Sequence, residues 1–135
     1  MNCIFCVAAV ETRDHIFFEC TVASSLWSAL FSLNGLQFKH HSWDAFFDLA
    51  AACWKGKSPL TTIMKIASNA LIYTIWKERN KRLFQSQSST VAEMFIAIKE
   101  LIADKKEDPK ERARLGLHSK QNRKGRHFFS IALNA

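Results

Sequence analysis

Three cysteines and one histidine lie close together at the start of the chain, in the pattern Cys3-x2-Cys6-x8-His15-x4-Cys20. A gap of two residues lets one tight turn present the sulfurs of Cys3 and Cys6 to a single ion. A gap of four residues places His15 and Cys20 about one helical turn apart, so their side chains can converge from one face. Three thiolates and one imidazole form a closed tetrahedral set, which suits Zn2+ and leaves no coordination position open for catalysis. The spacing therefore predicts one structural zinc ion.

The same residues have a second interpretation that needs no metal. Cysteine is often a small buried hydrophobe, and His15 can be a polar residue satisfied by hydrogen bonds. The fourth cysteine, Cys53, lies on an apolar segment beside Trp54 without a ligand-like partner nearby, and we expect it in the core. Four cysteines in 135 residues are too few for a disulfide-stapled secreted scaffold, so reduced thiols are expected.

The elements that must position these ligands are helical. Glycine (4) and proline (2) are scarce for 135 residues, which favours helices over turns. Ser42, Ser58 followed by Pro59, and Thr90 with Glu93 have the character of helix N-termini. Apolar periodicity between these signals predicts helices at about residues 22–33, 43–54, 59–84 and 91–105.

The fold class predicted is mainly α, with a small N-terminal zinc-knuckle-like loop, about four helices and a basic, partly disordered tail. Residues 1–27 are expected to hold the knuckle and the start of the first helix, 28–106 the helical region and 107–135 the tail. The segment 59–84 is expected to be central because it carries two apolar stripes, which indicates contact with more than one neighbour. The first stripe comprises Leu60, Ile63, Met64, Ala67, Leu71 and Ile75, and the second Ile66, Tyr73, Trp76, Leu83 and Phe84.

The positive charge of the chain is concentrated in its second half. The formal net charge is +7, and residues 1–75 are balanced, with five basic and five acidic side chains. Between residues 110 and 126 seven basic side chains face Glu111 alone. Such a segment is typical of binding to a polyanion, either nucleic acid or an acidic membrane surface. The alternative is a solvated tail that aids solubility.

Three other classes of protein are disfavoured. The uncharged apolar stretch 66–76 is far shorter than the roughly 20 residues that cross a bilayer, so no membrane span is expected. The apolar run 3–10 has no positive charge before it, so a signal peptide is not expected, and the predicted location is intracellular, in the cytoplasm or nucleus. No nucleophile and base are set together and no open metal site is indicated, so the chain is not predicted to be an enzyme.

Two groups of residues carry a resemblance to a known family. One group spans Cys3 to Trp27 and comprises Cys3, Cys6, Glu11-Thr12, Asp14-His15, Phe17-Phe18, Glu19-Cys20 and Trp27. The other is Ile75-Trp76-Lys77-Glu78-Arg79-Asn80-Lys81-Arg82, which is similar to an IW-x-ERN-x-R run. With these groups the chain resembles, over residues 1 to about 102, the zinc-binding region at the C-terminal end of reverse transcriptases of plant LINE-like (non-LTR) retrotransposons. It departs from the usual family pattern at Ile4 and Thr21, where proline is common.

The resemblance implies a non-catalytic zinc-binding fragment that assists sequence-nonspecific binding of RNA or DNA and contacts the rest of a reverse transcriptase. The paired aspartates of a polymerase palm and an endonuclease segment are not recognisable in the sequence. Basic side chains are the candidate phosphate contacts. They are Arg13, Lys77, Arg79, Lys81, Arg82, Lys110, Arg112, Arg114, Lys120, Arg123, Lys124 and Arg126.

Two alternatives stay open at this point. The run from Lys77 to Arg82 can be an ordinary solvated helix face. The whole chain can be a helical protein-interaction module in which zinc is purely structural and fixes the N-terminal loop.

Overall fold

The computed structural model describes residues 1–39, 42–54, 56 and 58–107. This part of the chain is mainly helical, as predicted, and an N-terminal Cys/His loop precedes the helices. Residues 1–39, 42–54, 56 and 58–107 contain no named strand; Asn2 and Val10 form an isolated antiparallel bridge. The elements in order are η1 (His15–Glu19), a π-helical turn, and four α-helices: α1 (Thr21–Leu33), α2 (Trp43–Cys53), α3 (Pro59–Gln85) and α4 (Val91–Glu107).

The local signals place the helix termini as expected. The Ser42 hydroxyl accepts a hydrogen bond from the Ala45 N–H at 3.2 Å, and the Ser58 hydroxyl does the same for Thr61. Thr90 and Glu93 form a reciprocal capping box, with backbone N–H to side-chain distances of 3.0 and 3.1 Å. The predicted N-termini of α2, α3 and α4 are therefore confirmed.

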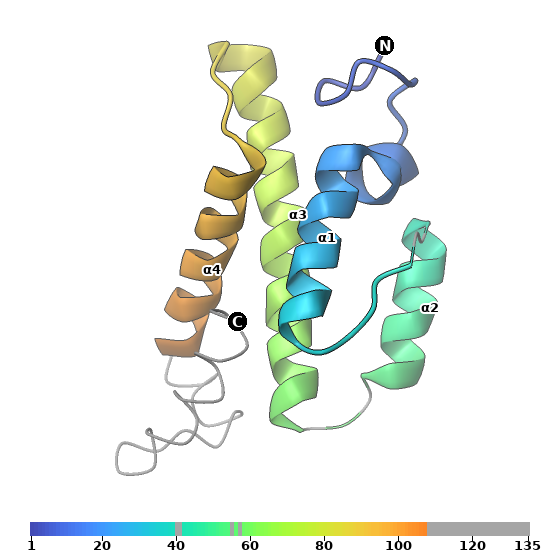
Figure 1. Ribbon diagram of the computed structural model, residues 1–135, viewed down its shortest axis with the longest axis vertical. Coiled ribbons are helices and arrows are strands. Elements are labelled where there is room, and N and C mark those ends of the chain that lie inside the picture. The colour runs from blue at the N-terminus through green and yellow to red at the C-terminus, as the bar shows by residue number, and fades with distance from the viewer. Residues whose placement is uncertain (40–41, 55, 57, 108–135) are drawn as a thin grey trace.

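α3 is the central helix (Figure 1), and it contacts α4, α1 and the η1 turn. Its first stripe is buried, with Met64, Leu71 and Ile75 fully covered. The α4 residues Met94, Ile98 and Ile102 are buried in the same core as this stripe. The prediction of a central helix with several neighbours is confirmed for this stripe.

The second stripe of α3 differs from the prediction. Tyr73, Trp76 and Phe84 are 48%, 53% and 80% exposed. The reason is geometric: α1 and α4 also contact each other, so both helices cover the same side of α3 and leave the opposite side open. The second stripe is therefore mostly exposed, although Ile66 packs against the core.

A cluster of aromatic rings joins the N-terminal turn to α1 and α2. Trp27 is fully buried between Phe18, with ring centroids 5.4 Å apart, and Phe46, at 4.8 Å. Rings of this size bury large apolar areas and dominate the energetics of a small core. The η1 turn, which carries one predicted ligand, is thus anchored directly in the core.

Cys53 is exposed, contrary to the expectation that it lies in the core. It is the last residue of α2, and Trp54, immediately after it, packs against Phe31 and Phe46 with centroids 6.3 and 5.8 Å apart. The indole, rather than the thiol, closes this end of the core.

No helix among the described residues has the length and apolar character that crossing a membrane requires. The proposed division into residues 1–27, 28–106 and 107–135 stays a prediction, and residues 108–135 lie outside the described part.

Candidate metal centre

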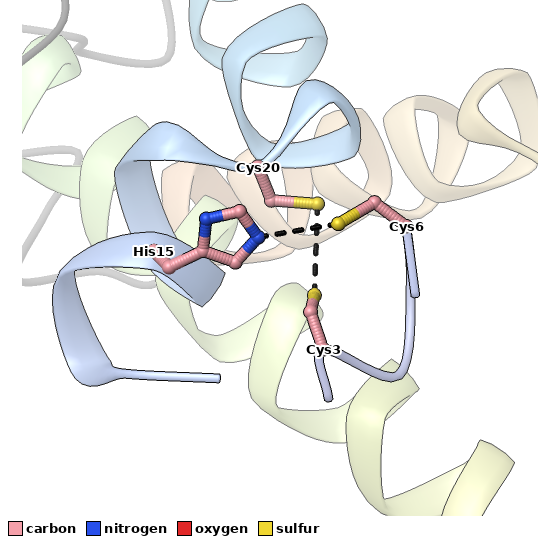
Figure 2. Close-up of side chains that lie close together, drawn as sticks. All are labelled: Cys3, Cys6, His15 and Cys20. Carbon is pink, nitrogen blue, oxygen red and sulfur yellow. Dashed lines mark hydrogen bonds between the residues drawn. The ribbon is translucent and has the colours of Figure 1, made fainter. Parts of the chain in front are cut away.

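The first two predicted ligands lie on a short N-terminal loop that folds back on itself. The Cys3 N–H donates to the Ala9 carbonyl at 2.8 Å, and the Val7 N–H donates to the Cys3 carbonyl at 2.9 Å. Val7 adopts a φ of 59°, which is the left-handed region that a β-branched residue rarely visits. This tight return brings Cys3 and Cys6 to the same side of the loop (Figure 2).

The other two ligands are brought together by the π turn. The Cys20 N–H donates to the His15 carbonyl at 2.7 Å, an i to i+5 bond. In an α-helix, at 3.6 residues per turn, side chains five positions apart point about 140° away from each other. An i to i+5 bond instead places the later residue over the earlier one. The predicted convergence of His15 and Cys20 is present, but it depends on a π turn rather than an ordinary helical turn.

The turn is held by two side-chain hydrogen bonds. The Trp27 indole N–H donates to the Phe17 carbonyl at 2.7 Å, from a fully buried position on α1. The Thr12 hydroxyl accepts from the His15 N–H at 3.0 Å at the start of the turn. π-Helical turns leave the normal helical bonding pattern and occur frequently at functional sites.

The four side chains converge on one point (Figure 2), and their ligand atoms all lie within 4.8 Å of one another. The sulfur atoms of Cys3 and Cys20 are 3.8 Å apart. A tetrahedron with metal–sulfur bonds of about 2.3 Å has its sulfurs about 3.8 Å apart. The Cys6 Sγ and His15 Nε2 atoms are 3.2 Å apart, slightly closer than such a tetrahedron requires. The four ligands can therefore hold one metal ion after small adjustments.

The thiols differ in their readiness to ionise. The Ala8 N–H and the His15 ring lower the pKa of the Cys6 thiol to about 6. Burial raises the pKa of the Cys20 thiol to about 11. Metal ions bind cysteine as the thiolate, so a metal bound here would displace the proton of Cys20. The positive charge of the metal would then stabilise the Cys20 thiolate, which burial otherwise disfavours.

The arrangement has the burial and the ligand set of a site that could hold one metal ion. Cys3 and Cys20 are completely buried, and Cys6 and His15 are half-buried. Four protein ligands complete a tetrahedral shell, which is typical of a structural site.

The candidate nucleic-acid residues on α3 are mostly engaged within the protein. Arg79 donates from Nε and Nη2 to the two carboxylate oxygens of Glu11, at 3.0 and 2.9 Å. Arg82 donates to the Glu78 carboxylate at 2.8 Å, and Lys81 lies 3.5 Å from the same group. Lys77 is exposed. The structure therefore gives three of these four residues an intramolecular partner.

The remaining candidates lie elsewhere. Arg13 is exposed, with its guanidinium 5.2 Å from the centre of the Trp43 ring and 4.0 Å from Asp44. The predicted contacts of the tail lie outside the described residues: Lys110, Arg112, Arg114, Lys120, Arg123, Lys124 and Arg126.

Sequence reasoning missed three residues that organise the site. Glu11 forms an ion pair with Arg79, and Glu78 forms ion pairs with Lys81 and Arg82. The Asp14 carboxylate accepts a hydrogen bond from the Trp43 N–H at 2.8 Å. Glu11, Asp14 and Glu78 all belong to the motifs of the family resemblance, which was the available signal. Charge counting alone could not pair Glu11 with a residue 68 positions away.

Comparison with protein-family models, curated proteins and solved structures finds nothing that matches this chain. The convergence of Cys3, Cys6, His15 and Cys20 is therefore the main structural indication of what the chain does.

Proposed function

We propose that the chain is a non-catalytic zinc-binding module of a LINE-like reverse transcriptase that assists the binding of RNA or DNA. One Zn2+ ion is held by Cys3, Cys6, His15 and Cys20. The convergence of all four ligand atoms within 4.8 Å supports the zinc site, and the sequence resemblance supports the reverse-transcriptase assignment.

The donor set favours zinc among the biological metals. Three thiolates and one imidazole are soft and borderline ligands, whereas Mg2+ and Ca2+ take oxygen. The 3.8 Å separation of the Cys3 and Cys20 sulfurs supports tetrahedral ligation. Zinc at such a site stabilises the folded loop and supplies no reactive water, which supports a structural role.

Affinity for nucleic acid is expected to reside mainly in the tail. Its seven basic side chains between residues 110 and 126 face a single acidic residue, Glu111. Exposed Lys77 adds one free cation, while Arg79 and Arg82 are already paired with carboxylates. Binding through phosphates alone is independent of sequence and strongly dependent on salt.

One observation favours the protein-interaction alternative. Tyr73 and Trp76 are half exposed on α3, with ring centroids 6.4 Å apart. Tyr73 also borders an open hollow of about 450 Å³ between α3 and α4, together with Lys65 and Lys105. Exposed aromatic side chains beside a concavity are typical of a surface that binds another protein.

A salt series separates these two functions. Binding of a fluorescent single-stranded RNA to the full chain should weaken with salt, with log K falling by about 0.7 per phosphate contacted. Contact with three to five phosphates gives a slope of roughly −2 to −3.5. Removing residues 108–135 should flatten this slope and abolish most of the affinity, whereas Arg13→Ala should change little. Absence of binding at low salt would refute the nucleic-acid role and favour the interaction module.

A further inference from the structure

Two arginines of α3 reach the N-terminal loop from the same side. Arg79 forms a bidentate ion pair with Glu11, with N–O distances of 3.0 and 2.9 Å. The pair is largely shielded, since the Glu11 side chain is only 11% exposed and that of Arg79 30%. Paired hydrogen bonds of this kind fix orientation as well as position.

Glu11 links Arg79 to the turn between the first two ligands, Cys3 and Cys6. The backbone amide of Ile4, which directly follows Cys3, lies close enough to the Glu11 carboxylate to help lower its pKa. The Glu11 backbone N–H also donates to the Met1 carbonyl at 2.9 Å. Glu11 therefore joins Arg79 to the start of the loop that carries Cys3.

Arg82 holds the next residue of the same turn. Its guanidinium lies 4.7 Å from the centre of the Phe5 ring, a cation–π contact. The guanidinium is fixed in turn by Glu78, at 2.8 Å, and by the Ser89 carbonyl, at 3.0 Å. Glu78 is 5% exposed and also accepts from the Ser89 N–H, so the anchor of Arg82 is buried at the α3–α4 connection.

Ile4 and Phe5 are the two residues between Cys3 and Cys6: the Ile4 amide lies near Glu11, the partner of Arg79, and the Phe5 ring contacts Arg82. We propose that Arg79 and Arg82 are positioning residues of the metal centre, which hold the Cys3–Cys6 turn in the ligating conformation before the ion binds. The inference rests on the proposed zinc site. It assigns the two arginines to the metal loop rather than to nucleic-acid phosphates.

The physical gain is preorganisation. A free two-cysteine turn must be ordered when the ion binds, and this conformational entropy reduces the affinity. Residues that orient metal ligands without binding the metal themselves typically lower metal affinity 10- to 100-fold when they are replaced. Arg79, which acts through a bidentate ion pair with Glu11, should contribute more than Arg82, which acts through a ring contact.

The experiment measures zinc affinity of the full chain by competition with a chromophoric chelator. Arg79→Ala should weaken zinc binding about 10-fold or more. Arg79→Lys keeps the charge but loses the bidentate geometry, so its zinc affinity should lie between those of Arg79→Ala and the wild type. Lys77→Ala is the matched control, because it removes the same charge from an exposed position on the same helix, and its affinity should equal that of the wild type.

Two further measurements separate positioning from general destabilisation. The cobalt-substituted Arg79→Ala protein should show altered ligand-field bands, because the Cys3–Cys6 turn no longer fixes the thiolate geometry. The double variant Glu11→Gln with Arg79→Ala should bind zinc no more weakly than Arg79→Ala alone, because both changes break one unit.

The outcomes are distinct. Wild-type zinc affinity and unchanged cobalt bands in Arg79→Ala would overturn the inference and leave the proposed zinc site intact. A wild-type chain that binds no zinc would remove the proposed function and the inference together. Equal loss in Lys77→Ala would also overturn the inference, because the effect would then be one of net charge.

Discussion

Cys20 donates its backbone N–H to the His15 carbonyl at 2.7 Å, and this single i to i+5 bond places two of the four ligands on the same side of the chain. An α-helical turn over the same residues would point the two side chains about 140° apart. The candidate metal centre therefore depends on a π turn, and the π turn depends on its anchors in the core. The fully buried Trp27 indole, bonded to the Phe17 carbonyl at 2.7 Å, is the most direct of these anchors.

Replacing Trp27 with phenylalanine should weaken both the core and the metal centre. The substitution removes the indole N–H and leaves the Phe17 carbonyl without its buried donor, at a cost of about 2 kcal/mol in the free energy of unfolding. Urea denaturation of the zinc-free and zinc-loaded protein measures this change. Trp54→Phe is the control at a half-buried indole, and a larger loss there would argue against the role of Trp27.

Val7→Gly should tighten the N-terminal loop. Val7 has a φ of 59° and a side chain 65% exposed, so its replacement relieves left-handed strain and removes little packing. Strain of about 1–2 kcal/mol is relieved, against roughly 0.5–1 kcal/mol of additional chain entropy in the unfolded state.

The net gain for Val7→Gly of about 0–1.5 kcal/mol corresponds to zinc affinity higher by up to about 10-fold. Chelator competition measures it. Val7→Ala retains a Cβ and should show no such gain, so equal improvement in both variants would contradict the strain argument.

Glu78 should make stability dependent on pH on the acid side. Burial acts to raise its pKa, but hydrogen bonds from Arg82 and Ser89 and the charge of Lys81 outweigh it, so the pKa lies below the ordinary 4.5. A carboxyl with a lowered folded-state pKa stabilises the fold above its unfolded pKa, and this stability is lost as pH falls through the folded value.

Urea denaturation of the zinc-free protein between about pH 6 and pH 3 tests this dependence. The free energy of unfolding should fall over the acid part of the range, and Glu78→Gln should flatten the fall. Glu100→Gln, at an exposed position on α4, serves as the control for loss of one negative charge. A profile for Glu78→Gln that matches the wild type would show that the buried carboxylate contributes nothing.

Local sequence signals predicted much of this fold. Ser42, Ser58 and Thr90 each place a side-chain oxygen where the first free backbone N–H groups of a helix need an acceptor. The ligand set was likewise identifiable from spacing, because chelation restricts how far apart ligands lie in the sequence. These interactions span three to about twenty residues, so short patterns contain them.

Other features depend on packing between distant segments. The hydrogen bonds of Arg79 to Glu11 cross 68 positions, and no periodicity in the sequence indicates them. The exposure of Trp76 follows from where α1 and α4 lie, because both cover the other side of α3. The π turn has no signal of its own in the sequence, since an α-helical turn fits the same residues until the two ligands must meet.

The most direct test of the central claim is the zinc content of the full chain purified without added metal, measured by elemental analysis. The account predicts one zinc per chain in the wild type and in Cys53→Ser, because Cys53 is exposed on α2 and lies outside the cluster. It predicts loss of stoichiometric zinc in Cys20→Ser. One zinc per chain in Cys20→Ser, or loss of zinc in Cys53→Ser, would contradict the ligand assignment, and absence of zinc from the wild type would contradict the metal centre itself.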